Sequence, residues 1–148
     1  MAEGQARVLI HRPAADIAEF VMDLRRYAEV DKKLGSIRSI ERTGDVVVFR
    51  FRPKLLGLPG PVTTQRVTLT PGRRIDIAGE PTWTDAMARF SAAFEFEEVP
   101  EGTWVTRRLT FTFPKVARPL LDPLFGRWLS REVPRELAAA KAYLEAGR

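Results

Sequence analysis

Residues 8–30 read VLIHRPAADIAEFVMDLRRYAEV, and this stretch decides the fold. Residues 6–11 alternate apolar and polar side chains, which predicts a β-strand with Ala6, Val8 and Ile10 on its buried side. Pro13 ends that strand because proline cannot donate a backbone hydrogen bond. Apolar residues then recur at helical spacing and predict two short helices before Gly35: Ile17, Phe20, Val21, Leu24, Tyr27, Val30 and Leu34.

Residues 36–113 consist of short β-rich runs separated by turn sequences at residues 43–45, 70–72 and 100–102. Within each run the apolar residues alternate with polar ones, so each strand has one apolar and one polar face. This pattern predicts an antiparallel meander that is covered on one side. The apolar set includes Val47, Phe49, Phe51, Val67, Leu69, Ile75, Ile77, Phe90, Phe94, Val105, Leu109 and Phe111.

The last segment predicts a long helix that covers the apolar face of the sheet. Asp122 followed by Pro123 has the pattern of an N-cap and first helical residue. Pro134 predicts a kink or break near residues 130–134, because it removes one helical hydrogen bond. Apolar residues recur every three or four positions: Leu121, Phe125, Trp128, Leu129, Val133, Leu137, Ala140 and Leu144.

Composition excludes several kinds of chemistry. The 148 residues include no Cys and one His, so thiol nucleophiles, Cys-based zinc sites and multi-His metal sites are excluded. Composition leaves carboxylate-bound Mg²⁺ or Ca²⁺ open, but no residue is assigned to a metal and we expect none. None of the four Ser lies in a G-x-S-x-G motif, and no glycine-rich nucleotide-binding motif is present, so we expect no cofactor. The chain has no repeat, linker or long apolar run, which predicts one domain over residues 1–148 and a cytoplasmic location.

The order of a strand, two short helices, a meander and a long C-terminal helix resembles the helix-grip fold of the START-related SRPBCC superfamily, in particular its polyketide cyclase/dehydrase-like branch. The resemblance is most specific at residues 8–30 and extends to the terminal LAAAKAYLE. It implies an α+β fold in which six or seven antiparallel strands wrap around the C-terminal helix. It also implies an elongated apolar cavity between sheet and helix, without specifying one chemistry.

Three polar residues share the phase of the apolar, cavity-facing set, namely Gln65, Arg107 and Glu132. Arg107 and Glu132 are candidate catalytic residues, since an Arg stabilises a developing enolate and a carboxylate accepts the proton. The competing interpretation is a structural Arg107–Glu132 ion pair at one end of the cavity. The predicted ligand-binding set is Tyr27, Phe49, Phe51, Gln65, Val67, Phe90, Phe94, Arg107, Leu109, Phe125, Trp128, Leu129 and Glu132.

Three functions follow as hypotheses. The first is binding of a hydrophobic small molecule, such as a polyketide, an aromatic compound or a lipid. The second is a polyketide cyclase or dehydratase that uses Arg and carboxylate acid–base chemistry, so enzyme activity stays open. The third is an interaction subunit whose cavity is filled by aromatic side chains. Under each hypothesis we expect a monomer or a homodimer.

The net charge of +5 is concentrated between residues 107 and 135, a segment that contains seven basic and two acidic residues. The aromatic residues follow the buried phase, so this excess does not predict a nucleic-acid site. Residues 53–61 form an apolar loop in which Leu55, Leu56 and Leu58 serve as a cavity plug, a lid or a transient membrane contact. Residues 83–85 (Trp-Thr-Asp) are a second candidate for the cavity rim.

Overall fold

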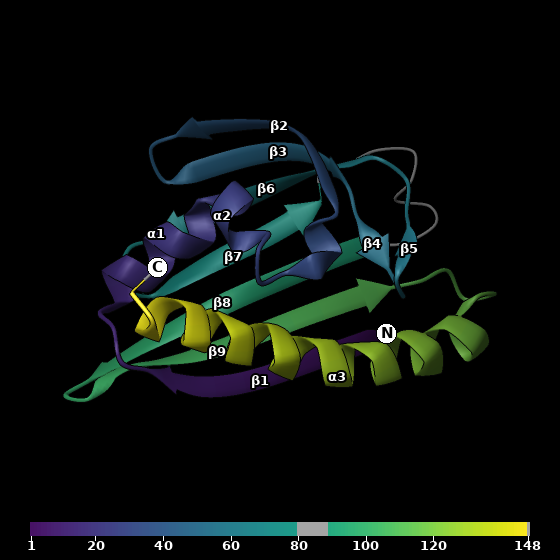
Figure 1. The fold of residues 1–148 in the computed structure, drawn as a ribbon. Coiled ribbons are helices and arrows are strands. Elements are labelled where there is room, and N and C mark those ends of the chain that lie inside the picture. The colour runs from purple at the N-terminus through teal and green to yellow at the C-terminus, as the bar shows by residue number, and fades with distance from the viewer. Residues whose placement is uncertain (80–88, 148) are drawn as a thin grey trace.

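A computed structural model describes residues 1–79 and 89–147 (Figure 1). A strand and a group of short helical segments come first, a meander follows, and a long helix ends the chain. The elements are β1 (Ala2–Ile10), α1 (Ala14–Met22), α2 (Leu24–Tyr27), the 3-10 helix η1 (Lys32–Leu34), β2 (Ser36–Thr43), β3 (Val46–Arg52), β4 (Lys54–Leu55), β5 (Leu58–Pro59), β6 (Thr63–Thr70), β7 (Arg74–Gly79), β8 (Arg89–Val99), β9 (Gly102–Thr112) and α3 (Arg118–Glu145).

Within the described residues the strands form a seven-stranded antiparallel sheet in the order β1-β9-β8-β7-β6-β3-β2. The sheet curves around α3, with α1 and α2 at one end and β4 and β5 at the other (Figure 1). The predicted alternation sets which side of each strand faces inward, because the predicted apolar set on β3, β6, β7, β8 and β9 is buried, apart from the half-buried Phe90. The predicted helix-grip architecture is therefore confirmed.

Helix α3 packs closely on β1 because that strand carries small residues on its inner side. Ala2 and Gly4 are buried, and a Cβ placed at Gly4 would lie 2.7 Å from Cβ of Leu129 and 2.9 Å from Cγ2 of Val133. Strand β1 begins at Ala2, four residues before the start that the alternation of residues 6–11 predicts. Short side chains give a weak hydrophobic signal, yet here they allow the closest approach of helix to sheet.

Two predictions about α3 are wrong, namely the N-cap at Asp122 and the break near Pro134. The helix begins at Arg118 with Pro119 in its first turn, and Asp122 accepts a hydrogen bond from the amino group of Met1 instead of capping the helix. The helix also continues through Pro134 without a break. Val133 and Leu137, which flank Pro134, are both buried, and this packing holds the helix across the missing hydrogen bond.

The apolar segment 53–61 forms a small hairpin of β4 and β5. Leu56 and Gly57 at its tip have φ values of 56° and 80°, the left-handed conformations that a tight two-residue turn requires. Residues 83–85, our second rim candidate, lie outside the described residues. No helix among the described residues is long and apolar enough to cross a membrane.

Candidate functional site

An apolar cavity of about 320 Å³ lies between the sheet, α3 and the short helical segments. Phe residues of β3, β8 and β9 form much of its wall, and Phe125 contributes from α3. These aromatic side chains line the space and leave it open, in contrast to the filled cavity of our third hypothesis. The lining residues are Val21, Leu24, Tyr27, Asp31, Lys33, Leu34, Phe49, Phe51, Pro53, Leu55, Pro61, Thr63, Gln65, Ile77, Gly79, Phe90, Phe94, Arg107, Leu109, Phe111, Phe113, Leu121 and Phe125.

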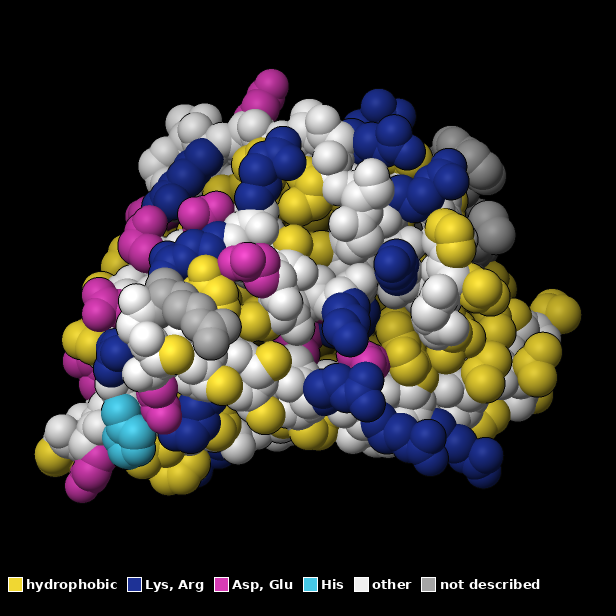
Figure 2. Space-filling model, in the orientation of Figure 1, with side chains coloured by type: hydrophobic (Ala, Val, Ile, Leu, Met, Phe, Trp, Pro, Cys, Tyr) yellow, Lys and Arg dark blue, Asp and Glu magenta, His cyan; other side chains and the backbone are white. Residues whose placement is uncertain are grey.

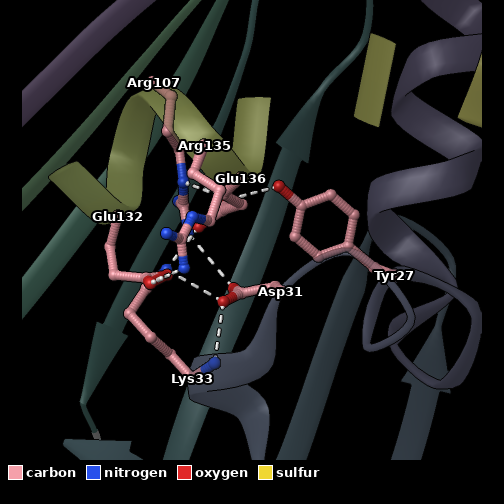
Figure 3. A network of polar contacts seen from close by, with 7 residues as sticks. All are labelled: Tyr27, Asp31, Lys33, Arg107, Glu132, Arg135 and Glu136. Atoms are coloured by element: carbon pink, nitrogen blue, oxygen red, sulfur yellow. Dashed lines mark hydrogen bonds and ion pairs between the residues drawn. The ribbon is translucent and has the colours of Figure 1, made fainter. Parts of the chain in front are cut away.

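Five polar side chains from four elements meet beside this cavity (Figure 3). Glu136 of α3 is their centre: Arg107 donates from Nε to its Oε2 at 3.0 Å, and both the Tyr27 hydroxyl and Lys33 Nζ also donate to its carboxylate. Asp31 lies 2.9 Å from Lys33 Nζ and 3.7 Å from Arg107 Nη2. We call these residues, Tyr27, Asp31, Lys33, Arg107 and Glu136, the buried charge network.

The buried charge network contains two cations and two carboxylates, so its formal charges cancel. None of its members is more than 8% exposed. Removing charges from water is costly, and the cost is offset only when each charge has opposite partners and hydrogen bonds. The network meets this condition for Glu136, which accepts three hydrogen bonds.

The two carboxyl groups of the network differ in their proton affinity. Burial raises the pKa of Asp31, the negative charge of Glu136 raises it further, and Lys33 and Arg107 offset these effects only in part. Burial alone would also raise the pKa of Glu136, but Arg107 and Lys33 lower it below its ordinary value. Glu136 is therefore the fixed counter-charge, and Asp31 is the carboxyl that takes up a proton more readily.

The phenol and the ammonium group both hold their protons more tightly than usual. Burial and the negative charge of Glu136 raise the pKa of Tyr27 well above its ordinary value. Burial alone would lower the pKa of Lys33, but Asp31 and Glu136 raise it. Tyr27 and Lys33 are thus hydrogen-bond donors throughout the neutral range.

Local structure explains how the network is assembled. Arg107 faces inward because it has the phase of Val105 and Leu109 on β9. Asp31 caps η1 by accepting a hydrogen bond from the backbone N–H of Lys33 at 3.1 Å, which turns both side chains toward α3. Tyr27 ends α2, and its ring contacts Phe20 and Phe94 edge-on.

Arg107 also has an unsatisfied donor. Its guanidinium carbon lies 4.2 Å from the centre of the Phe94 ring, and its Nη1 is buried without a hydrogen-bond partner. A buried unpaired N–H is costly, and such an atom in a cavity-lining side chain is a place where a ligand oxygen would be stabilised. Gln65 provides a second polar group on the cavity wall.

Nine of the predicted ligand-binding residues line the cavity: Tyr27, Phe49, Phe51, Gln65, Phe90, Phe94, Arg107, Leu109 and Phe125. Val67 and Leu129 are buried in the core beside it. Trp128 packs perpendicular to the ring of Phe125 and, together with Glu132, lines a separate hollow.

The predicted pair of Arg107 with Glu132 is wrong, because the partner of Arg107 is Glu136. Glu132 accepts a hydrogen bond from Arg135 at 3.4 Å and lies outside the network (Figure 3). Glu132 and Glu136 lie one turn apart on α3. Because we expected a break at Pro134, we did not extend the buried face of the helix as far as Glu136. Glu136 lies seven residues, or two helical turns, after Leu129 and therefore on the same face of the helix. Extending the helical periodicity through Pro134 would have identified it.

Asp31 and Lys33 were missed altogether. They belong to a three-residue helical turn in which no periodicity can develop, so the sequence carries no sign that they are buried. A capping Asp was the only available signal, and it indicates local structure without indicating burial.

A second, solvent-open hollow of about 560 Å³ adjoins the network. Asp31 and Lys33 line both this hollow and the apolar cavity, so they stand between the two spaces. The remaining lining residues are Ala28, Lys32, Gly35, Lys54, Leu56, Gly57, Trp128 and Glu132.

Comparison with known proteins agrees with this architecture. The model of a family described as polyketide cyclase / dehydrase and lipid transport matches residues 1–145. TTHA0849 from Thermus thermophilus has a similar structure, with 19% identity, a TM-score of 0.75 and 99% of each chain covered. A START superfamily protein from Mycobacterium smegmatis has 16% identity and a TM-score of 0.74, again with 99% of each chain covered.

The di-domain ARO/CYC StfQ from the steffimycin biosynthetic pathway is also similar, with 17% identity and a TM-score of 0.76 over 98% of this chain and 51% of that chain. At these identities the similarity establishes the fold. No curated protein matches the chain.

Proposed function

Because the chain belongs to the polyketide cyclase / dehydrase and lipid transport family, we propose that it binds a hydrophobic small molecule in the cavity between the sheet and α3. The observation that carries this proposal is an apolar cavity of about 320 Å³ with an unsatisfied Arg107 donor in its wall. That volume is at the lower end of the range of about 300–1,000 Å³ that is usual for small-molecule sites.

The polar end of the cavity suits a neutral oxygen. A carbonyl or hydroxyl oxygen placed near Arg107 would accept the hydrogen bond that Nη1 lacks. A ligand carboxylate would instead add an uncompensated charge to a network whose charges already cancel, at a cost of several kcal/mol. We therefore expect an aromatic or polyketide-like ketone or phenol to bind better than a free fatty acid.

Fluorescence titration with prodan, a neutral aromatic ketone, tests the proposal. Ile77 lines the cavity, while its neighbour Ala78 is exposed on the other side of β7, so Ile77→Phe fills the cavity and Ala78→Phe is the matched control. We expect Ile77→Phe to abolish the blue-shifted emission of bound prodan and Ala78→Phe to retain it. Equal binding to both variants would contradict a ligand site in the cavity.

The Arg107→Lys variant tests the polar end separately, because it keeps the positive charge and removes the Nη1 donor. Prodan affinity should fall about tenfold, the effect of losing one hydrogen bond to a charged donor. Binding of N-phenyl-1-naphthylamine, which has no carbonyl, should change little. Stronger competition by dodecanoic acid than by a neutral ketone would contradict the charge argument. Native mass spectrometry of protein purified from its host would then identify the natural ligand.

Asp31 favours a second candidate function, that of a cyclase or dehydratase. Its carboxyl has a raised pKa, lines the cavity and lies 3.7 Å from Arg107 Nη2. In this reaction the Asp31 carboxylate would remove a proton from a carbon between two carbonyls, and Arg107 would stabilise the resulting enolate. This assigns to Asp31 the role that we predicted for Glu132.

Proton exchange measures this activity without knowledge of the natural substrate. Benzoylacetone incubated in D₂O should exchange its central protons faster with the wild-type protein than with Asp31→Asn, as followed by NMR. Glu132→Gln is the control and should exchange at the wild-type rate. If the wild-type protein does not accelerate exchange of a compound that it binds, the chain is a binding protein.

A further inference from the structure

Large apolar side chains are exposed together at one end of the molecule. Leu58 of β5 is 69% exposed, and Val116, Leu120 and Leu124, just before and within α3, are 95%, 72% and 45% exposed. Figure 2 shows hydrophobic side chains gathered at the edge of the molecule where these two segments lie. We call Leu58, Val116, Leu120 and Leu124 the apolar tip.

The apolar tip is the outer side of a wall whose inner side lines the cavity. On the hairpin, Leu55 lines the cavity and pairs with the exposed Leu58. On α3, Leu121 and Phe125 line the cavity, and each follows directly after an exposed residue of the tip, Leu120 or Leu124. None of the four tip residues lines the cavity or the hollow. They project outward at the end of the cavity opposite α1 and α2.

Basic residues continue the same side of α3. Leu120, Leu124, Arg127 and Arg131 follow one another at intervals of four, three and four residues, so they share one face of the helix. Both arginines are exposed, and neither forms an ion pair with a residue in the described part of the chain. Lys115 adds a third exposed cation beside Val116. The exposed face therefore changes from apolar to basic along the helix.

We propose that this surface docks reversibly on a lipid bilayer that contains anionic lipids. The apolar tip would insert among the acyl chains, and Lys115, Arg127 and Arg131 would contact lipid phosphates. A bilayer is the occupant that the geometry favours, since projecting leucines next to phosphate-binding cations match the boundary between acyl chains and headgroups. The proposal does not depend on which ligand occupies the cavity.

Sedimentation with vesicles tests the docking. Vesicles of phosphatidylcholine and phosphatidylglycerol at a 3:1 ratio should bind the wild-type protein, and vesicles of phosphatidylcholine alone should bind it at least tenfold more weakly. Leu120→Asp should lower binding to the anionic vesicles about tenfold or more. Arg127→Gln and Arg131→Gln should each lower it about fivefold at low salt, with the difference shrinking at 0.5 M salt.

Matched controls distinguish an effect of the apolar tip and its neighbouring cations from a general effect of changing the protein's charge. Ala138→Asp introduces the same charge on the same exposed side of α3, about 27 Å farther along the helix, and should leave vesicle binding unchanged. Arg50→Gln removes an exposed charge from the outer side of β3 and should also have no effect. If the control variants lost as much vesicle binding as Leu120→Asp, Arg127→Gln and Arg131→Gln, the proposal would be overturned.

Two further results distinguish the alternatives. Light scattering of the wild-type protein and Leu120→Asp determines whether the tip joins two copies of the chain. A wild-type dimer that dissociates in Leu120→Asp, with no vesicle binding, would assign the surface to self-association and overturn membrane docking. Leu120→Asp should still bind prodan and Ile77→Phe should still bind vesicles, so failure of one proposal can be told from failure of the other.

Discussion

Arg107 of β9 and Glu136 of α3 form a buried ion pair, with Nε 3.0 Å from Oε2, within an otherwise largely apolar contact between helix and sheet. Both side chains are at most 3% exposed. The pair connects the last strand to the closing helix and places the Arg107 guanidinium over Phe94. Its formation therefore shapes the polar end of the cavity.

Removing one partner of this pair leaves the other charge uncompensated, so the two losses of stability should not add in the double variant. Glu136→Gln leaves Arg107 and Lys33 with Asp31 as the remaining carboxylate of the network, so we expect the free energy of unfolding to fall by about 3–5 kcal/mol in urea denaturation. The double variant Arg107→Gln with Glu136→Gln restores the charge balance and should lose less than the sum of the two single variants. Glu132→Gln is the control and should change stability by less than about 1 kcal/mol.

Stability should decline at alkaline pH because of Tyr27 and Lys33. The pKa of each is raised in the folded protein, so the unfolded chain releases these protons first as the pH rises past about 10. The stabilisation is complete below that pH and is lost as the pH rises toward the folded-state pKa values, by up to about 1.4 kcal/mol per pH unit for each group. Urea denaturation between pH 8 and 11 measures this slope.

Tyr27→Phe is the control for the alkaline slope, since it removes one of the two groups. The variant should show a shallower decline than the wild-type protein over the same pH range. Identical slopes would mean that the Tyr27 phenol ionises as readily in the folded as in the unfolded protein.

Two glycines near α3 should respond to Ala in opposite directions. At Gly4 a Cβ meets the backbone oxygen of Leu129 at 2.9 Å, so Gly4→Ala must push the helix away and should destabilise the protein by about 1–3 kcal/mol. At Gly126 a Cβ meets no atom within 4 Å, so Gly126→Ala should stabilise α3 by up to about 1 kcal/mol. Thermal unfolding of both variants checks the sign, and a neutral Gly4→Ala would show that β1 and α3 can separate without cost.

The sheet could be predicted in detail because alternation of residue types directly encodes which side of a strand is buried. Arg107 was placed correctly inside by its phase with Val105 and Leu109. The same reasoning identified Phe49, Phe90 and Phe94 as cavity-facing residues.

The partners of Arg107 could not be predicted in the same way. Finding Glu136 required knowing that packing of Val133 and Leu137 would carry α3 through Pro134, which is a tertiary effect. Asp31 and Lys33 lie in a turn too short for any pattern, and only the folded chain brings them to Glu136. Local propensity and periodicity describe single elements, whereas this network joins four of them.

The position of Asp31 and Lys33 between the apolar cavity and the open hollow has a kinetic consequence. A molecule that left the cavity on this side would have to separate Lys33 from both Asp31 and Glu136, and thus expose unpaired charges during the passage. Away from these two charged residues, the cavity wall includes Leu55 of the β4–β5 hairpin and Leu121 of α3, which are held by apolar contacts. Bound molecules should therefore exchange past these apolar side chains, with a residence time set by how often the hairpin moves aside.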